Sequence, residues 1–343
     1  MFKSQKVKAF FVALMMLTTA IFSACGNEKT PEAKDDGKTA EEKPVVIGTM
    51  NLVNGDLIAQ YEKWYENELG TKVKVIRFDS GKDVISALAS NSIDIGEAGT
   101  SPAALAISNN LDIKVIFVGD VIGAAETLVA KNDSGISSVK DLAGKKVATP
   151  FASTAHYSLL NALKLAGMTE TDCQLLDLQP DDIFAAWQRG DIDAAYVWYP
   201  VLGRLMETGK SITNSEELAS KGIVTADLVV ARTPFIEEHP DVVKKFIEIQ
   251  LKANDMILDD PQKAAKEIAS VLEISEKDAA EQITQFKYLK ANDQIEILEK
   301  LMAKTLKDTA DFLVEQKSIK TAPSLEDFNT KVTAEFVKNA SAK

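Results

Sequence analysis

Residues 185–200 read Ala-Ala-Trp-Gln-Arg-Gly-Asp-Ile-Asp-Ala-Ala-Tyr-Val-Trp-Tyr-Pro, a pattern of helix, tight turn and apolar strand that also occurs earlier in the chain. Asp94 precedes Asp193 by 99 positions (193 − 94 = 99), and at the same offset Gly99 corresponds to Trp198. A repeated unit of this kind predicts two lobes of similar build. Their equivalent loops would then face a shared cleft.

Short apolar strands alternate with amphipathic helices in both copies of the repeat. We expect strands at 45–48, 73–76, 93–95, 146–148, 173–176 and 192–195, with helices at 57–69, 84–89, 157–165 and 183–187. This alternation predicts an α/β fold with mainly parallel sheets that are covered by helices on both faces. Ligands of such sheets bind beyond the carboxyl ends of the strands.

The N-terminus has the organisation of an export signal. A lysine-containing segment precedes an apolar run at 9–22, which is too short for an ordinary membrane span. Small residues then lead to Cys25 in a Phe-Ser-Ala-Cys-Gly sequence that resembles a lipoprotein cleavage site. We therefore expect residues 1–24 to be a signal peptide, Cys25 to be lipidated, and the polar segment 25–44 to form a flexible membrane tether.

Composition argues against several other classes of function. The 343-residue chain has a formal net charge of −12, which disfavours a surface for nucleic acid. With Cys25 lipidated, Cys173 is expected to be a buried, unpaired core residue. His156 and His239 lie far apart in the sequence, so we expect no metal site, and a Gly-x-Ser-x-Gly nucleophile motif does not occur. We expect no cofactor.

Four hydroxyl residues stand where helices begin. Ser153 and Thr154 precede one predicted helix, and Thr100 and Ser101 hold the equivalent place in the first copy. A helix start offers free N–H groups and a favourable dipole to a sulfonate, phosphate or carboxylate. Helix capping alone also explains each hydroxyl, but two equivalent loops favour a ligand. His156, in the first turn of the same helix, is either a structural histidine or a further donor.

The repeat separates scaffold positions from ligand candidates. Asp94 and Asp193 recur in both copies, and we interpret both as structural acids that bond backbone amides. Trp187 matches an apolar helix position and is expected to pack in the core. Trp198 replaces a glycine at a strand exit, where an aromatic ring belongs either to the core or to the cleft wall. A wall position would attract an ammonium group through a cation–π interaction.

Five segments carry a resemblance to a known family: 78–81, 99–102, 151–160, 178–180 and 185–198. They resemble the taurine-binding proteins of ABC importers and, more broadly, binding proteins for aliphatic sulfonates and nitrate. The resemblance covers about residues 45–335. It implies a periplasmic-binding-protein-like fold, in which two lobes are joined by two chain crossings and close on the ligand.

The resemblance also implies roles for individual residues. Asp227 is the match for a carboxylate that grips the ligand amine, although an acid before an apolar strand can also be a turn cap. Glu126 is a second candidate for the amine, or a solvated hinge residue. In the first loop, Asn51 is expected to make a polar contact and Met50 a nonpolar one. Glu97 stands where the family has an amide residue.

These inferences define an expected organisation and function. Lobe 1 is expected to comprise 45–127 and 229–338, and lobe 2 residues 128–228. The implied protein is a monomeric extracytoplasmic lipoprotein that captures taurine and delivers it to an ABC permease with its ATPase. The alternatives are a binding protein for another sulfonate, nitrate or a small zwitterion, an exported enzyme, or a ligand sensor on the same fold.

Overall fold

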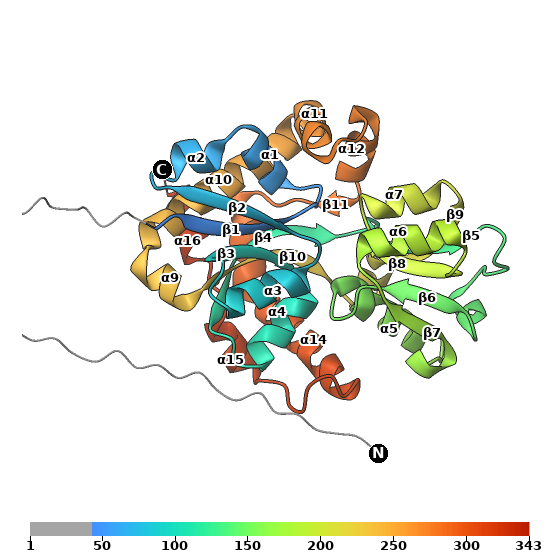
Figure 1. Ribbon diagram of the computed structural model, residues 1–343. Coiled ribbons are helices and arrows are strands. Elements are labelled where there is room, and N and C mark those ends of the chain that lie inside the picture. The colour runs from blue at the N-terminus through green and yellow to red at the C-terminus, as the bar shows by residue number, and fades with distance from the viewer. Residues whose placement is uncertain (1–42, 343) are drawn as a thin grey trace, which may run out of the picture. The chain divides into compact units, whose positions relative to one another are not determined.

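Two β-sheets organise the part of the chain that the computed structural model describes, residues 43–342 (Figure 1). Sheet A has the strand order β11 (Phe286–Lys287), β4 (Ile113–Ile122), β10 (Ala226–Arg232), β3 (Ile95–Gly99), β1 (Val45–Met50) and β2 (Val73–Phe78). Sheet B has the order β7 (Gln174–Asp177), β6 (Lys146–Thr149), β8 (Ala194–Trp198), β5 (Glu126–Lys131) and β9 (Gly209–Asn214). Cys25, the signal peptide and most of the expected tether lie outside the described residues.

Helices connect and cover these strands. Those before β10 are α1 (Gly55–Tyr61), α2 (Trp64–Glu68), α3 (Gly81–Ala89), α4 (Thr100–Ser108), α5 (Thr154–Leu165), α6 (Pro180–Arg189), α7 (Val201–Met206) and α8 (Ser215–Ala219). After β10 follow α9 (Thr233–Glu238), α10 (Pro240–Asp259), α11 (Pro261–Leu272), α12 (Glu276–Ile283), α13 (Ala291–Ile297), α14 (Ala303–Glu315), α15 (Leu325–Thr330) and α16 (Glu335–Ser341). A π-helical turn at Leu298–Met302 joins α13 to α14. Within 43–342, none of these helices is long and apolar enough to cross a membrane.

Both sheets combine parallel and antiparallel pairing. The predicted strand–helix repeats are parallel, because β1 pairs with β2 and β3, and β6 pairs with β7 and β8, in the same direction. The strands that follow the chain crossings are antiparallel: β5 pairs with β8 and β9, and β10 with β3 and β4. The sheets are therefore mixed, since each receives a strand that enters from the other sheet.

The two crossings place Glu126 and Asp227 at the ends of strands. The chain leaves sheet A after β4 and enters sheet B at Glu126, the first residue of β5. It returns after α8 and enters sheet A at Ala226 in β10, one residue before Asp227. Glu126 thus belongs to sheet B, although the expected bounds put it in lobe 1. Asp227 belongs to sheet A, although the expected bounds put it in lobe 2.

Asp94 and Asp193 fasten equivalent strands in the two sheets. The Asp94 carboxylate accepts a hydrogen bond from Val46 N at 2.9 Å, and that of Asp193 accepts one from Lys146 N at 2.8 Å. Val46 and Lys146 belong to β1 and β6, the corresponding first strands of the two copies. The structural interpretation of both acids is confirmed, and so is the internal repeat.

Local sequence signals fix several helix ends. Helix α6 has Pro180 in its first turn and ends at Gly190, whose φ of 79° suits a glycine cap. The expected single helix at 57–69 is wrong: α1 ends at Tyr61, and Lys63 adopts a left-handed φ of 58° before α2 starts. A left-handed residue interrupts the helical hydrogen-bond ladder, which apolar periodicity alone does not reveal.

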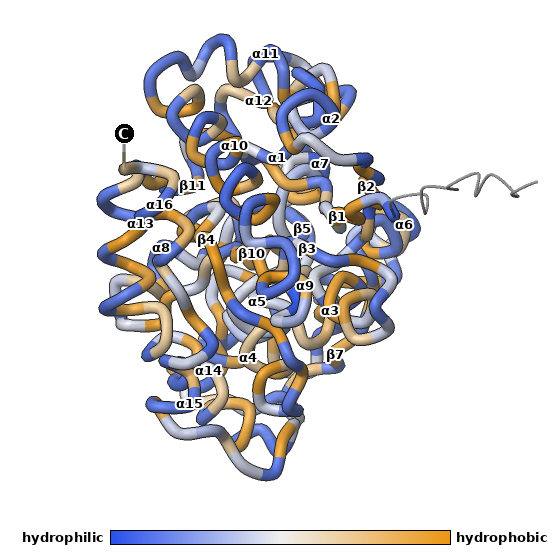
Figure 2. Tube along the Cα trace, turned by 90° about the vertical axis from the view of Figure 1, so that its left-hand side faces the viewer, coloured by the Kyte–Doolittle hydropathy of each residue, from blue (hydrophilic) through white to orange (hydrophobic). Residues whose placement is uncertain are grey.

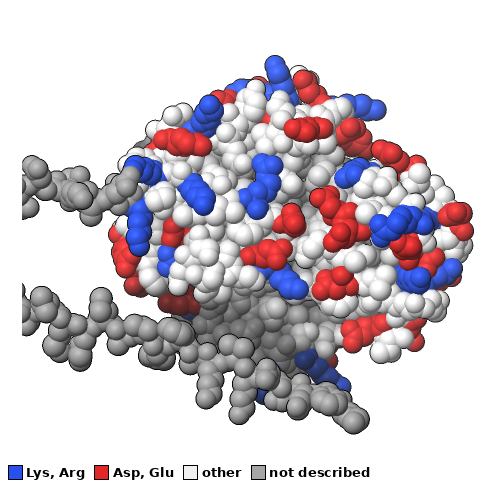
Figure 3. All heavy atoms as spheres, in the orientation of Figure 1, with Lys and Arg blue, Asp and Glu red and all other residues white. Residues whose placement is uncertain are grey.

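Apolar side chains form the core around both sheets. Figure 2 shows hydrophobic positions along the central strands, with hydrophilic positions toward the outer turns and helix ends. Trp187 of α6 is buried beside sheet B, as predicted, and its Nε1 donates to Thr208 Oγ1 at 2.9 Å. Cys173 is buried and free, also as predicted. On the face that Figure 3 shows, acidic and basic side chains are interspersed.

Helix α14 packs against helices of both parts of the fold. It contacts α4, which follows β3 of sheet A, and its Phe312 lies edge-on to Tyr157 of α5 with ring centroids 5.1 Å apart. Phe312 is buried in the same apolar cluster as Tyr157 and Leu159. Lys164 Nζ also lies 2.5 Å from a Glu315 carboxylate oxygen. These contacts tie α5, and with it one rim of the site described next, to α14 and through α14 to α4.

Candidate functional site

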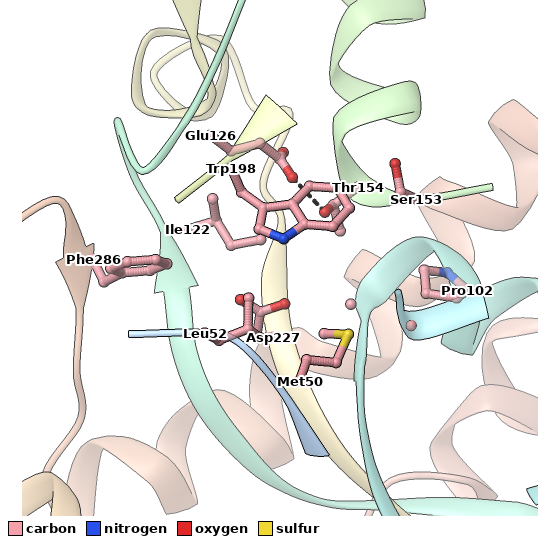
Figure 4. A pocket seen from close by; sticks show the side chains of 12 residues that line it. Met50, Leu52, Pro102, Ile122, Glu126, Ser153, Thr154, Trp198, Asp227 and Phe286 are labelled. Carbon is pink, nitrogen blue, oxygen red and sulfur yellow. Dashed lines mark hydrogen bonds between the residues drawn. The ribbon is translucent and has the colours of Figure 1, made fainter. Parts of the chain in front are cut away.

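A small pocket lies between the two sheets, where strand ends and helix starts converge (Figure 4). Its lining comes from both sides: Met50, Leu52, Gly81, Gly99, Pro102, Ile122, Glu126, Ser153, Thr154, Trp198, Asp227 and Phe286. The cavity volume is about 30 Å³, against about 230 Å³ for an outer cavity on the other side of Trp198. The inner pocket therefore suits a ligand of few non-hydrogen atoms.

Three helices begin at the pocket. Gly81 is the first residue of α3, Gly99 caps the N-terminus of α4, and Ser153 caps that of α5. The first N–H groups of a helix have no partner within it, and the helix dipole is positive at this end. Three such ends around one cavity form an electropositive rim without any Lys or Arg among the lining residues. This rim favours an anion.

The Ser153 and Thr154 side chains are already engaged by protein groups. Ser153 Oγ donates to Pro150 O at 2.5 Å and accepts from His156 N at 3.1 Å. Thr154 Oγ1 donates to Glu126 Oε2 at 2.6 Å. Both residues line the pocket, as the sequence predicted, but their hydroxyl protons point to protein oxygens. Their backbone N–H groups are what the start of α5 offers to an anion.

Thr100 and Ser101 differ from Ser153 and Thr154, because their hydroxyls are not engaged by protein groups of the described chain. They form the first turn of α4 and are buried, next to the lining residues Gly99 and Pro102. Neither hydroxyl has a hydrogen-bond partner within residues 43–342. Buried hydroxyls without a partner are costly, so these two are available donors beside the pocket.

Two sequence candidates lie away from the inner pocket. Asn51 is exposed and lines the outer cavity, while Met50 and Leu52 line the inner one. The His156 ring stacks on Phe151, with centroids 4.4 Å apart, and its Nδ1 accepts from Ala152 N at 3.4 Å. Burial lowers the pKa of His156 to about 4, although the charge of Asp177 opposes this shift. A neutral, stacked ring fits the structural interpretation of His156.

Glu126 is the first acid at the pocket, and three hydroxyls surround it. Thr154 Oγ1, Ser158 Oγ and Ser215 Oγ donate to its carboxylate at 2.6, 3.3 and 2.9 Å. Burial raises the pKa of Glu126 to about 7, although these three donors lower it. Its carboxylate thus ties α5 and α8 to the start of β5.

Asp227 is the second acid at the pocket and is also buried. Burial raises its pKa to about 7, and the negative charge of Glu126 adds to the rise. Directly opposite Asp227 on the neighbouring strand β4 is Asp120, which was not identified from the sequence. Burial, followed by the charges of Asp227 and Glu97, raises the pKa of Asp120 well above its ordinary value. This edge of the pocket therefore favours a positive group.

Glu97 forms part of the scaffold behind the first loop. It accepts hydrogen bonds from Asn54 Nδ2 at 2.6 Å and Met50 N at 3.2 Å. These contacts join β3 to the segment after β1. Burial raises the pKa of Glu97, and so do the charges of Asp56 and Asp227.

Trp198 forms a wall between the inner pocket and the outer cavity, because it lines both. It pairs with Glu126 across the antiparallel strands β8 and β5. Ile122 and Phe286 complete the apolar lining and were not identified from the sequence. Phe286 lies in a strand of two residues, which gives no periodicity signal. Asp120 did leave a signal, as a lone acid in the apolar run of β4.

Metal binding finds no support in the described residues, where no cluster of three or more His, Cys, Asp or Glu side chains has the geometry to hold an ion. The pocket instead presents helix N–H groups at its rim and carboxyl groups at another edge, with apolar side chains between them. Such an arrangement is chemically complementary to a small molecule that carries both signs of charge.

Comparisons with known proteins agree with this geometry. Residues 52–264 match the model of a family described as NMT1/THI5 like. The taurine-binding periplasmic protein of Escherichia coli is 38% identical over 305 residues, which cover 87% of this chain and 94% of that protein.

Solved structures share the fold at lower sequence identity. The alkanesulfonate-binding protein SsuA from Xanthomonas axonopodis pv. citri, solved with bound MOPS, has a TM-score of 0.70 at 23% identity, over 83% of this chain and 96% of that one. The desulfurization enzyme DSZB has a TM-score of 0.62 at 15% identity, over 87% of this chain and 99% of that one. The fold alone thus occurs in binding proteins and in an enzyme. The family match over 52–264 and the 38% identity over most of the chain show that this protein belongs to the NMT1/THI5-like family, together with the taurine-binding relative.

Proposed function

We propose that this protein is an extracytoplasmic solute-binding lipoprotein that captures taurine between its two lobes and delivers it to an ABC permease. One observation carries the proposal: a single small pocket has three helix starts at one edge and the Asp227 carboxyl at the other. Taurine has a sulfonate and an ammonium group two carbons apart. The identity to the taurine-binding relative adds independent support.

At the anion edge, backbone N–H groups of α3, α4 and α5 bind the sulfonate, and the Thr100 and Ser101 hydroxyls add two donors. Their lack of a protein partner supports this role. At the cation edge, Asp227 binds the ammonium and the Trp198 face supports it through a cation–π interaction. Glu126 acts mainly through charge, since its oxygens already accept from three hydroxyls.

The sheets A and B, with their helices, serve as lobes 1 and 2, and closure between them encloses the ligand. In the structure the two sides of the pocket are already in contact: Gly99 approaches Thr154, and Lys82 Nζ lies 3.8 Å from an Asp177 carboxylate oxygen. The lipidated Cys25 and the segment to residue 44 tether the lobes to the membrane near the permease.

The protein binds without catalysing a reaction. The lining residues include no Cys or His, and their two hydroxyls donate to protein oxygens. Cys173, the cysteine within residues 43–342, is buried in the apolar cluster beside sheet B.

Calorimetric titration of the mature domain with taurine, ethanesulfonate, nitrate and β-alanine tests the ligand. We expect taurine to bind most tightly, because only a ligand with both charges satisfies both edges, and a sulfonate fills the three-helix rim better than a carboxylate does. Equal affinity for taurine and ethanesulfonate would refute the role of the carboxylate edge. A preference for nitrate would instead indicate a nitrate-binding protein.

A further inference from the structure

Asp120 and Asp227 form a pair of buried carboxyls at the cation edge of the pocket. They are register partners on the antiparallel strands β4 and β10, beside an irregularity in the pairing after Asp227. Both are buried, Asp120 completely. Directly opposite residues of antiparallel strands carry their side chains on the same face of the sheet, with Cβ atoms about 5 Å apart, so the two carboxyls can hydrogen-bond when one of them is protonated. Asp227 lines the pocket, and Asp120 lies behind it.

The pair differs from the other buried acids nearby in its lack of donors. Asp56 accepts from Gln60 Nε2 at 2.6 Å and also from the hydroxyls of Thr49 and Tyr65. Glu97 and Glu126 likewise accept from amide, backbone or hydroxyl donors. Both carboxylate oxygens of Asp120, in contrast, have no donor in the described part of the chain.

The surroundings of the pair supply no positive charge. The charged and titratable groups that act on it are Glu97 of β3, Glu126 of β5 and the phenol of Tyr288 after β11. None of these is a cation, and no ion pair within residues 43–342 involves Asp120 or Asp227. Two adjacent carboxylates without donors or a cation cannot both stay ionised in a buried site, so they share a proton.

We propose that Asp120 is a specificity-determining residue: with Asp227 it holds one proton in the ligand-free protein, and the ammonium group of the ligand displaces that proton. The exchange is balanced. A protonated amine enters with one positive charge, the carboxyl pair changes from one negative charge to two, and one proton leaves to solvent. This inference rests on the proposed function only in that the ligand carries an amine.

The exchange explains how a pocket with a second buried acid discriminates among sulfonates. A ligand without an amine leaves the shared proton in place and gains nothing from Asp120. A ligand with an ammonium group meets two carboxylates, one in the pocket wall and one directly behind it. A quaternary ammonium has no N–H to donate to Asp227 and would gain less than a primary amine.

Calorimetry in two buffers of different ionisation enthalpy measures the exchanged proton. At pH 8, above the pKa of about 7 of Asp227, we expect taurine binding to release about one proton per ligand in the wild type and close to none in Asp120→Asn, which removes the shared acid but keeps the shape. The matched control is Asp311→Asn, because Asp311 is an exposed acid of α14 that does not line the pocket, and this variant should release the same number of protons as the wild type. A binding enthalpy that is equal in both buffers for the wild type overturns the proposal while leaving taurine binding intact.

A second measurement does not depend on the ligand. In protein labelled with ¹³C at the aspartate carboxyl carbon, we expect two coupled carboxyl resonances of the ligand-free wild type to titrate well above the ordinary range. In Asp120→Asn one of these signals should be absent, and the other should titrate in a single uncoupled step. If all aspartates of the wild type titrate in the ordinary range, the shared proton is refuted even if taurine is not the ligand.

Discussion

Gly99 of β3 and Thr154 of α5 meet across the pocket so closely that a Cβ atom on Gly99 would lie 2.6 Å from Thr154 Cγ2. Real Cβ atoms do not approach another atom this closely, so any other residue at Gly99 must push the two helix starts apart. Gly99 caps α4 and Thr154 begins α5, both at the anion rim. The absence of a side chain at Gly99 therefore lets the start of α5 lie this close to the end of β3.

Gly99→Ala should weaken taurine binding about tenfold, because the added methyl group must be accommodated at a packed contact that closure creates. The variant should fold normally, since Gly99 has a negative φ that any residue adopts. Affinity is measured by calorimetry and the free energy of unfolding by urea titration.

Thr154→Ser offers a rescue for this substitution. It removes Cγ2, the atom in closest contact, and keeps the hydroxyl that donates to Glu126. The double variant Gly99→Ala, Thr154→Ser should recover most of the lost affinity, while Thr154→Ser alone should bind nearly as the wild type does. Additive losses in the double variant would show that the contact does not limit closure.

Asp227→Asn should lower the affinity for taurine at least about 30-fold, because the ligand ammonium loses its charged partner in a buried site. Ethanesulfonate, which lacks the amine, should lose much less affinity and serves as the internal reference for a folded anion rim. Calorimetric titration of both ligands gives the comparison. Equal losses for both ligands would make Asp227 a structural residue and would count against the carboxylate edge.

The sequence predicted the parts of the fold that repeat. Asp94 and Asp193 stand at the same place in both copies, so a common structural role was the simplest interpretation, and both bond the first strand of their sheet. The regular alternation of strands and helices likewise predicted the parallel βαβ units. The antiparallel strands β5 and β10 could not be predicted from local pattern, because their direction depends on where the chain crosses between sheets.

Site residues were predictable where they lie at helix starts or strand exits, as Ser153, Thr154 and Trp198 do. Side-chain direction was not predictable. Asn51 follows the end of β1 and turns to the outer cavity. His156 turns back onto Phe151, a contact set by the loop before α5. Which of several buried acids lacks donors depends on tertiary packing, so Asp120 became a candidate only with the structure.

Cys25→Ser should release the protein from membranes, because a hydroxyl cannot take the place of the thiol that is lipidated at the proposed cleavage site. Fractionation of cells that express each form, followed by detection of the protein in soluble and membrane fractions, measures the effect. Cys173→Ser is the matched control, since this buried thiol has no part in anchoring and the variant should remain with the membrane. Unchanged membrane retention of Cys25→Ser would exclude the lipid anchor.

The stability of the ligand-free protein should fall as the pH rises, to the extent that Asp227 controls it. Its folded-state pKa of about 7 exceeds the ordinary value, so the folded state keeps a proton that the unfolded chain loses near pH 4. The resulting stabilisation is complete below pH 4 and disappears as the pH rises through about 7. Relative to Asp227→Asn, the wild type should lose about 2 kcal/mol in free energy of unfolding between pH 5 and pH 8, measured by urea denaturation.

His156 acts in the opposite direction, because its lowered pKa costs stability below about pH 6.5, but it is present in both proteins and cancels in the difference. Saturating taurine should offset the loss at pH 8, since the ammonium group compensates the ionised carboxylate; a difference between the two proteins that does not change with pH would mean that Asp227 is already ionised at pH 5.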